Sequence, residues 1–384
     1  MKSPIYIIGG GIIGLLSAHE LEKAGERVVV LDRRVVGHES SWAGGGILSP
    51  LYPWRYPEPV NQLAHWSQRA YPELAQSLRE STQLDVEWIR SGLLVLNGAD
   101  STDTGDAIAW AERWAVPLVR LDRAALHAFV PPMNPAIEQA LYFPEVAQIR
   151  NPRLLAALRQ VLIGRGVELR ENVEVLGFEQ RQGCLQRLHT SIGSLSAERC
   201  IVAAGAWSAE LLKGTGVALD HSPVKGQMLL LRPRAPLISR IILNEGYYLI
   251  PRRDGRILVG STQEQTGFDK ATSAAARAEL CAAAQTMVPA LADTEVEQQW
   301  AGLRPGSPQG IPIIDRHPEI RGLYICTGHF RNGLAMAPAS ARLMADVVLG
   351  RPPIIDPAPY RLAAGSRGDS AFGDSGRATE RGPT

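Results

Sequence analysis

A glycine-rich turn between two apolar runs opens the chain and constrains its fold more than any other feature. Apolar residues fill positions 5–8, glycines follow with the spacing GxGxxG, and a second apolar run at 28–31 ends at Asp32. The glycines with that spacing are Gly9, Gly11 and Gly14. The pattern predicts a strand, a tight turn, a helix and a second strand that ends in an acid. A glycine turn in an ordinary α/β protein is the alternative.

The order of these elements is typical of dinucleotide binding, and each glycine has a physical role in it. The first permits the sharp turn, the second lets the backbone approach a pyrophosphate, and the third allows the helix to pack closely on the strand. The pyrophosphate would lie at the helix N-terminus, where free N–H groups and the helix dipole favour anions. Asp32 would accept hydrogen bonds from the adenosine ribose. Arg33 and Arg34 follow, but the adjacent carboxylate would repel a 2′-phosphate, so we interpret both as solvated surface arginines.

Length and composition limit the classes of protein that fit. The 384 residues are enough for two domains or one large bilobal unit. A formal net charge of +1 gives no reason to expect binding to nucleic acid or to an anionic membrane. No apolar run approaches transmembrane length, and glycines interrupt the N-terminal apolar stretch, so we expect neither a membrane span nor a secretory signal. The 4 cysteines are scattered without a CxxC pair, so we predict buried thiols, a cytoplasmic location and no metal site.

Periodicity and turn residues predict further elements. Helices are predicted at residues 11–24, 60–82, 104–115 and 333–349. Strands are predicted at residues 199–205, 224–232, 247–251, 256–260 and 323–327. Asp254 and Gly255 indicate a hairpin between two of these strands. Asn151 and Pro152 indicate another helix start, with Asn151 as the N-cap.

Three more segments rich in small residues follow predicted strands. They are residues 40–46 (SSWAGGG), 203–208 (AAGAWS) and 327–333 (TGHFRNG). Hydroxyl groups and bare backbone amides let a phosphate or a ring system come close, although a flexible loop or tight strand packing would use the same residues. In the third segment, the start of the last helix would stabilise negative charge at the N1–C2=O edge of a flavin. Capping by Asn332 would explain part of this segment but leaves Arg331 unexplained.

Together these motifs resemble the FAD-dependent amine and amino-acid oxidases of the D-amino-acid oxidase superfamily, and within it the glycine oxidases of the thiamine pathway. The resemblance covers residues 4–360 and also rests on PVKGQ (223–227), YLIPR (248–252) and WAGLRPG (300–306). It implies a mixed α/β fold in which an inserted antiparallel-sheet substrate domain interrupts a Rossmann-like FAD-binding domain. The predicted ranges are 1–50, 145–220 and 318–362 for the FAD-binding domain and 51–144 and 221–317 for the substrate domain. Residues 363–384 are too polar to order themselves and are predicted to be a disordered tail.

The resemblance, with the glycine pattern, implies a cofactor site and a substrate site. The implied cofactor contacts are Gly9, Gly11, Ile12, Ile13, Gly14, Asp32, Arg33, Ser40, Ser41, Gly45, Gly46, Ile47, Val175, Gly205, His329, Phe330, Arg331, Asn332, Gly333, Leu334 and Ala335. The family's substrate residues correspond to Arg304, which pairs with the substrate carboxylate, Tyr248, which assists it, and Arg331. A planar guanidinium meets a carboxylate through two parallel charge-assisted bonds and so orients the substrate. The alternatives are a surface loop for Arg304, core packing for Tyr248 and a general-base role for His329.

Two departures from the family pattern have consequences for the site. Some members have a histidine two residues before the hairpin tyrosine, where this chain has Gly246, so the preferred amine is open. The chain also has no cysteine near Phe330 of the kind that tethers the flavin in sarcosine oxidases. We therefore expect FAD to be bound non-covalently.

The activity implied is oxidation of glycine, or another small amino acid or amine, by hydride transfer from Cα to flavin N5. Molecular oxygen would be the acceptor, with hydrogen peroxide, glyoxylate and ammonia as products or the imine passed into thiazole formation. A homo-oligomer is also implied. The main alternative is an FAD-dependent D-amino-acid or 2-hydroxy-acid dehydrogenase with another electron acceptor. A non-catalytic FAD-binding module and a nicotinamide-dependent dehydrogenase are weaker alternatives.

Overall fold

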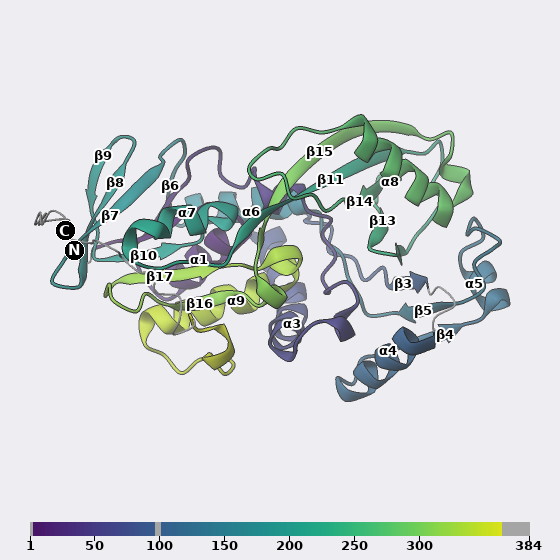
Figure 1. Ribbon diagram of the computed structural model, residues 1–384, viewed down its shortest axis with the longest axis horizontal. Helices are drawn as coiled ribbons and strands as arrows, with labels where there is room; N and C mark the ends of the chain where they lie inside the picture. The colour runs from purple at the N-terminus through teal and green to yellow at the C-terminus, as the bar shows by residue number, and fades with distance from the viewer. Residues whose placement is uncertain (1–2, 97–100, 363–384) are drawn as a thin grey trace, which may run out of the picture.

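The computed structural model describes residues 3–96 and 101–362, with only the backbone of residues 101–102. The tail predicted at 363–384 lies outside this part of the chain. Two large sheets, each with its own covering helices, make up the two halves of the molecule in Figure 1. The predicted mixed α/β fold is confirmed, since one sheet is mainly parallel and the other mainly antiparallel.

A six-stranded sheet forms the half on the left of Figure 1. Its strands, in spatial order, are β16 (Ile313–Arg316), β17 (Leu323–Thr327), β10 (Arg199–Val202), β1 (Ile5–Ile8), β2 (Val28–Leu31) and β6 (Glu168–Arg170). All neighbours run parallel except β16, which is antiparallel to β17. Every residue of β1 and β2 is buried, as expected for parallel strands that are covered on both faces.

Side chains alternate between two cores on the faces of this sheet. Ile5 and Ile7 of β1 face a core built with helices, whereas Tyr6 and Ile8 face a core built with a small second sheet. The helices on the first face are α1 (Ile12–Lys23), α3 (Glu58–Thr82), α6 (Asn151–Gly164) and α9 (Gly333–Leu349). The elements on the second face are β7 (Val175–Arg181), β8 (Cys184–Thr190), β9 (Gly193–Ser196) and α7 (Ser208–Leu212).

An eight-stranded sheet forms the half on the right of Figure 1. Its order is β15 (Glu295–Gly306), β11 (Ser222–Arg232), β14 (Ile257–Gly260), β13 (Tyr247–Pro251), β12 (Ile241–Asn244), β3 (Leu93–Leu96), β5 (Ala140–Phe143) and β4 (Val119–Leu121). Its pairs are antiparallel except that of β12 with β3. Leu94 faces the core under α8 (Ala274–Met287) and α5 (Arg123–Phe129), and Leu93 faces the core under α4 (Ser101–Arg113).

Several single helical turns complete the chain. They are α2 (Ser40–Ala43), η1 (Pro53–Arg55), η2 (Gly205–Trp207), η3 (Lys213–Thr215), η4 (Pro289–Leu291), η5 (Pro308–Gly310), η6 (Phe330–Asn332) and η7 (Ala358–Tyr360). Three of them, α2, η2 and η6, come after the parallel strands β2, β10 and β17. The carboxyl ends of parallel strands lie at one edge of a sheet, which is where α/β proteins bind ligands.

Most of the elements predicted from the sequence are confirmed, and one helix start is wrong. The strand at 323–327 and the last helix at 333–349 have the predicted bounds, and the 247–260 hairpin turns at Gly255. Asn151, however, is the first helical residue and Arg150 is the N-cap. The Asn151 amide donates instead to the carbonyls of Ser41 and Gly44, at 2.8 and 3.0 Å. The predicted domain division stays a prediction, although it separates β16 from its partner β17.

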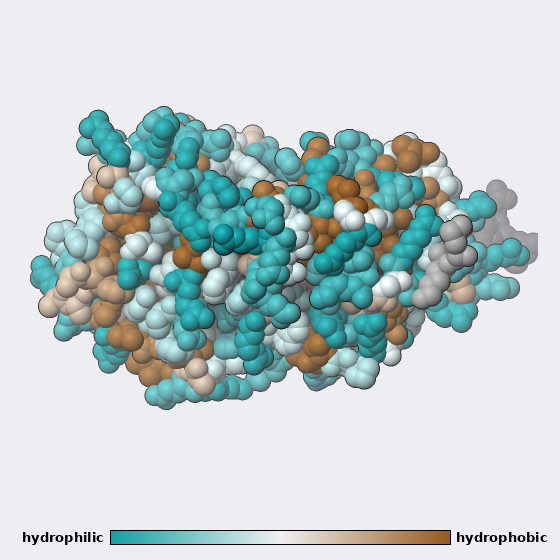
Figure 2. Space-filling model, turned by 180° about the vertical axis from the view of Figure 1, so that it is seen from behind, coloured by the Kyte–Doolittle hydropathy of each residue, from teal (hydrophilic) through white to brown (hydrophobic). Residues whose placement is uncertain are grey.

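The surface and the cysteines add two observations. Cys200 and Cys326 are buried, but Cys184 and Cys281 are partly exposed, so the prediction of four buried thiols is wrong for these two. Figure 2 shows a mainly hydrophilic face on which apolar residues form small, separate groups. Within residues 3–96 and 101–362, no helix combines the length and the apolar character needed to cross a bilayer.

Candidate active site

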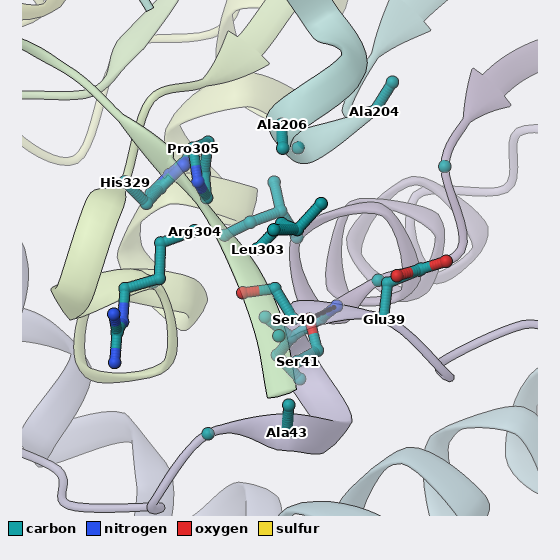
Figure 3. Close-up of a pocket in the computed structure, with 18 of the residues that line it drawn as sticks. Glu39, Ser40, Ser41, Ala43, Ala204, Ala206, Leu303, Arg304, Pro305 and His329 are labelled. Atoms are coloured by element: carbon teal, nitrogen blue, oxygen red, sulfur yellow. Dashed lines mark hydrogen bonds between the residues drawn. The ribbon is translucent and has the colours of Figure 1, made fainter. Parts of the chain in front are cut away.

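A cavity of about 420 Å³ lies between the two large sheets and brings most of the predicted site residues together. It is lined by Gly9, Gly11, Ile12, Ile13, Asp32, Arg33, Ser40, Ser41, Gly45, Gly46, Ile47, Val175, Gly205, Tyr248, Arg304, His329, Phe330, Arg331, Gly333 and Leu334. Three predicted residues, Gly14, Asn332 and Ala335, are not in its wall. Figure 3 shows residues 39–43 beside residues 303–305 of β15, with the Arg304 side chain directed away from Glu39.

The glycine turn packs against the neighbouring strand and leaves the start of α1 open to the cavity. Gly9 has a φ of +105°, and a Cβ atom there would collide with the carbonyl of Ala203. No side chain of the turn caps α1, and the Ile12 N–H instead donates to the Ser41 hydroxyl at 2.9 Å. A Cβ atom at Gly14 would collide with the Gly9 carbonyl, so this glycine serves the packing of helix on turn. The backbone can therefore approach a pyrophosphate here.

Asp32 occupies the end of β2 that the sequence predicts for a ribose ligand. Its two carboxylate oxygens accept hydrogen bonds from the backbone N–H groups of Gly10, at 2.8 Å, and Arg34, at 2.9 Å. Burial raises the pKa of Asp32, while these two N–H groups oppose that rise. The carboxylate is thus held in one orientation at the cavity wall, where each oxygen retains a lone pair for a ligand hydroxyl.

Arg33 is not the solvated surface residue that the sequence suggests, whereas Arg34 is exposed. The Arg33 guanidinium carbon lies 3.7 Å from the centre of the Trp207 ring, which is a cation–π contact. Trp207 also lines the cavity and was not predicted as a site residue. Its position in AAGAWS, directly after the run of small residues, is the only signal in the sequence that could have indicated it.

At the other end of the cavity, η6 and the start of α9 present unpartnered polar groups. Asn332 is the N-cap of α9 but makes no side-chain cap bond, so the predicted capping is wrong. The Nδ2 of Asn332 and the Nε2 of His329 are buried and have no hydrogen-bond partner among the described residues. Burial lowers the pKa of His329 to about 3, with a smaller effect of His221. A base that weak does not support a general-base role for His329.

Arg304 lies on β15 and reaches the cavity across the backbone of β11. Its guanidinium donates to the Ser261 hydroxyl at 2.7 Å and to the carbonyls of Thr262, at 3.2 Å, and Lys225, at 3.4 Å. No Asp or Glu of the described residues forms an ion pair with it. Burial lowers its pKa to about 10, so it remains a cation at neutral pH. A Cβ atom at Gly226 would collide with the guanidinium, so the missing side chain of Gly226 makes room for it.

Tyr248 and Arg331 approach the same cavity from β13 and η6. The Tyr248 hydroxyl lies 3.4 Å from the Met228 sulfur, a weak acceptor, and Tyr248 is otherwise buried. Arg331 donates to the Gly246 carbonyl at 3.3 Å, and the Gly246 N–H donates to the Tyr52 hydroxyl at 3.2 Å. Two guanidinium groups and a phenol are therefore gathered at the end of the cavity away from Asp32.

Arg252, the last residue of the YLIPR motif, is a further residue of the site with a role that the motif does not predict. Its buried guanidinium donates to the Gly45 carbonyl at 2.7 Å, to Gln148 Oε1 at 3.0 Å and to the Ile149 carbonyl at 3.3 Å. It therefore ties the hairpin that carries Tyr248 to the glycine segment of the cavity wall. Only a contact between residues far apart in sequence could have indicated this role.

Comparison with known proteins identifies the family. A family model described as FAD dependent oxidoreductase matches residues 5–347. A glycine oxidase from Pseudomonas putida is 46% identical over 361 residues, which cover 94% of this chain and 98% of that protein. The chain belongs to the glycine oxidase family of FAD-dependent oxidoreductases. It is therefore an FAD-dependent amino-acid oxidase, and the predicted family, cofactor and class of reaction are confirmed.

Two further members extend the comparison. The crystal structure of a glycine oxidase from Geobacillus kaustophilus superposes with a TM-score of 0.89 at 31% identity, covering 94% of this chain and 98% of that one. A bifunctional protein ThiO/ThiG from Trichormus variabilis is 34% identical over 356 residues, which are 91% of this chain but 53% of that protein. Glycine oxidases thus share this fold over nearly the whole chain.

The cavity fits the FAD of this family at both ends. At one end, the start of α1, where the Ser41 hydroxyl accepts from the Ile12 N–H, would hold the pyrophosphate, and Asp32 would hold the ribose. At the other end, the start of α9 and the unpartnered nitrogen of His329, which lines the cavity, would meet the polar edge of the flavin ring. Gly11 and Gly45 of the cavity wall pack tightly: a Cβ atom would lie 3.1 Å from the Ser41 hydroxyl at the first and 2.9 Å from Ile250 at the second.

Replacing Asp32 with alanine is expected to weaken FAD binding because the ribose hydroxyls lose a charged acceptor. The expected loss is about 1.5–3 kcal/mol, the usual range for a hydrogen bond to a charged group. Asp32→Asn keeps one acceptor oxygen and is expected to lose less. Titration of the apoprotein with FAD, followed by the quenching of flavin fluorescence, measures the dissociation constants. Equal affinity of wild type and Asp32→Ala would show that Asp32 does not hold the ribose.

FAD is expected to come free of the polypeptide when the protein is denatured by acid. Cys326 borders the cavity, but it is buried in β17, and burial raises the pKa of its thiol so that the reactive thiolate is disfavoured. The absorbance of the supernatant after precipitation of the protein measures release. Yellow colour that stays in the precipitate would contradict non-covalent binding.

Proposed function

We propose that this chain oxidises glycine, or another small amino acid, to its imine. The observation that carries the proposal is the buried cation of Arg304, whose hydrogen-bond partners are all neutral. A buried cation without a counter-ion attracts an anion of matching shape, and a carboxylate matches a guanidinium with two parallel bonds. The name of the Pseudomonas putida relative supports glycine as the amino acid.

The residues around Arg304 orient this substrate. Ser261, Thr262 and Lys225 hold the Arg304 guanidinium, so the direction in which it can donate to a carboxylate is fixed before the substrate arrives. Tyr248 has only a weak acceptor in the protein, so its hydroxyl is free to donate to the same carboxylate. A carboxylate held by Arg304 and Tyr248 keeps the Cα of the substrate at a constant distance from these two side chains.

Among residues 3–96 and 101–362, no acidic side chain at the substrate end of the cavity is a candidate base. The acidic residues in the cavity wall, Asp32, Glu39, Glu174 and Glu210, belong to elements of the six-stranded half and its cover. The strands β13 and β15, which supply Tyr248 and Arg304, contribute none. Bound FAD would supply the two-electron acceptor for a hydride from Cα of the neutral amine, with molecular oxygen as the final acceptor that is reduced to hydrogen peroxide. The side chains therefore bind and orient the substrate without removing a Cα proton.

The turn between β12 and β13 bears on which amino acids are oxidised. A Cβ atom at Gly246 would meet nothing within 4 Å, so this position, where some family members have a histidine, leaves open space beside Arg331. Arg331 contacts the backbone carbonyl of this residue in place of a side chain. We infer that small amino acids with a substituent on nitrogen or Cα are also oxidised.

The imine would hydrolyse to glyoxylate and ammonia or serve in thiazole formation for thiamine. The resemblance to thiamine-pathway oxidases supports the second fate, and the relative named ThiO/ThiG is in keeping with it. The homo-oligomeric assembly also stays a prediction, which sedimentation equilibrium would measure.

The test is a panel of small amino acids and amines assayed in parallel for hydrogen peroxide in air and for dye reduction without oxygen. We expect peroxide with glycine and with small substituted amino acids. Dye reduction without peroxide would favour the dehydrogenase alternative. A flavin that none of the compounds bleaches would exclude the proposed activity.

A further inference from the structure

The segment 261–273, which joins β14 to α8, spans from the substrate end of the cavity to its FAD end; we call it the strap. Its first residues, Ser261 and Thr262, hold the Arg304 guanidinium. Its later residues contact the six-stranded half of the molecule, which supplies the FAD-binding turn. A single segment therefore contacts both ends of the site.

The base of the strap is fixed by a buried lysine. Lys225, 4% exposed, pairs with Glu264 by backbone hydrogen bonds of 2.9 and 3.0 Å. Its ammonium lies 3.1 Å from the Glu264 carboxylate and 3.4 Å from that of Asp269, and it donates to the Ala271 carbonyl at 3.2 Å. Three residues of the strap thus surround the Lys225 ammonium, which holds the far end of the strap in place.

The far end makes two contacts with residues of the cavity wall. Phe268 stacks on Trp207, with ring centres 5.5 Å apart and an angle of 23° between the planes. The Arg33 guanidinium also lies against Trp207, 3.7 Å from the ring centre. The Lys270 ammonium donates to Glu39 at 2.8 Å, and Glu39 also lies 3.7 Å from Arg33.

These contacts matter for the cofactor because their partners line the cavity. Trp207, Arg33 and Glu39 belong to its wall near Asp32, whereas Phe268 and Lys270 do not. Phe268 is 43% exposed and Lys270 lies at the surface, so neither contact is required to fill a core. A stack and an ion pair at the surface each contribute little to folding, but together they restrain the side chains that border the adenosine end.

We propose that the strap is a clasp that retains FAD, and that Phe268 and Lys270 are the residues that fasten it. When the stack and the ion pair are broken, Trp207 and Arg33 are free to move and the adenosine end of the cavity opens. Release of FAD then no longer has to wait for the strap to detach. The inference rests on FAD binding in this cavity and not on which amine is oxidised.

The test measures the rate at which FAD leaves the holoenzyme after dilution, from the rise in flavin fluorescence. Phe268→Ala with Lys270→Ala is expected to release FAD about tenfold faster than wild type, the combined effect expected for one stack and one surface ion pair. Lys270→Glu, which would face Glu39 with a like charge, is also expected to accelerate FAD release. Lys270→Arg keeps the positive charge and is expected to release FAD at the wild-type rate. Arg113→Ala is the matched control, because it removes a 2.6 Å ion pair with Glu58 outside the cavity wall.

The salt dependence of FAD release provides a second readout, in which each protein is compared with itself at low and at high salt. High salt screens the Lys270–Glu39 pair, so FAD release from wild type and from Phe268→Ala should quicken with salt. Release from Lys270→Ala should respond less. Three results would each overturn the proposal. The double variant could release FAD at the wild-type rate, Arg113→Ala could accelerate release as much as the double variant does, or the salt response could be the same with and without Lys270.

Discussion

Replacing Arg304 with leucine is expected to abolish efficient oxidation of glycine while the protein stays folded and yellow. Leucine removes the cation that we propose as the partner of the substrate carboxylate. Loss of one member of a desolvated charge pair commonly costs about 2–5 kcal/mol, or roughly thirty- to several-thousand-fold in binding. Steady-state peroxide release over a range of glycine concentrations measures kcat/KM.

Arg304→Lys is the matched control, because it keeps the positive charge but not the planar guanidinium. A lysine keeps the positive charge but cannot form two parallel bonds, so it should restore only part of the lost kcat/KM. Arg331→Leu tests the second guanidinium in the same cavity. A larger loss in Arg331→Leu than in Arg304→Leu would assign the carboxylate to Arg331 instead.

Gly226→Ala is expected to reduce glycine oxidation about a hundredfold by displacing Arg304, although no polar side chain of the site is removed. The new Cβ atom would take the space of the Arg304 guanidinium and displace it from Ser261, Thr262 and the Lys225 carbonyl. A shift of about 1 Å in a positioning group can lower the rate by this factor. The atoms that must move are at the far end of a long side chain and not in the backbone, so the effect on the melting temperature should be smaller than the effect on activity.

The comparison of amino acids with amines that have no carboxylate shows whether Gly226 acts through Arg304. The loss should appear for amino acids and be much smaller for amines that have no carboxylate. Gly164→Ala is the control, because a Cβ atom there would meet nothing within 4 Å. Unchanged kinetics with glycine in Gly226→Ala would contradict the contact that the structure describes.

The sequence predicts those parts of the fold that depend on local patterns. The strand, glycine turn and helix at residues 5–23 follow from hydrophobic periodicity and from three glycines. The last helix at 333–349 is predicted to the residue because Gly333 and Gly350 bound one continuous apolar pattern. The two halves of the hairpin around Gly255 are predicted from its turn residues.

Contacts between distant residues could not be predicted in this way. Ser41 accepts a hydrogen bond from the start of α1, which lies 29 positions earlier, so no cap is visible in the sequence next to that helix. Asn151 has the residue type of an N-cap but is used to hold the segment at 41–44. The stack of Phe268 on Trp207 joins two segments that have no shared motif.

The site shows the same division. Most of the residues that the motifs predict for the site line the cavity, because the glycine-rich motifs follow parallel strands that end at one edge. They could not predict that Gly226 makes room for Arg304 or that Ser261 and Thr262 hold it. Gly226 lies on β11, whereas Ser261 and Thr262 follow β14, and the approach of Gly226 to Arg304 depends on the register of β11 with β15, in which Gly226 is opposite Gly302.

The central claim is that Arg304 binds the carboxylate of an amino acid whose Cα–H is oxidised. Stopped-flow reduction of the bound flavin without oxygen tests it most directly, with wild type and Arg304→Leu each mixed with glycine and with an amine of similar size that has no carboxylate. We predict a large loss for glycine in Arg304→Leu and a much smaller change for the amine, which never used the arginine. Reduction of Arg304→Leu by glycine as fast as wild type at the same concentration, or an equal loss for both compounds, would contradict the account.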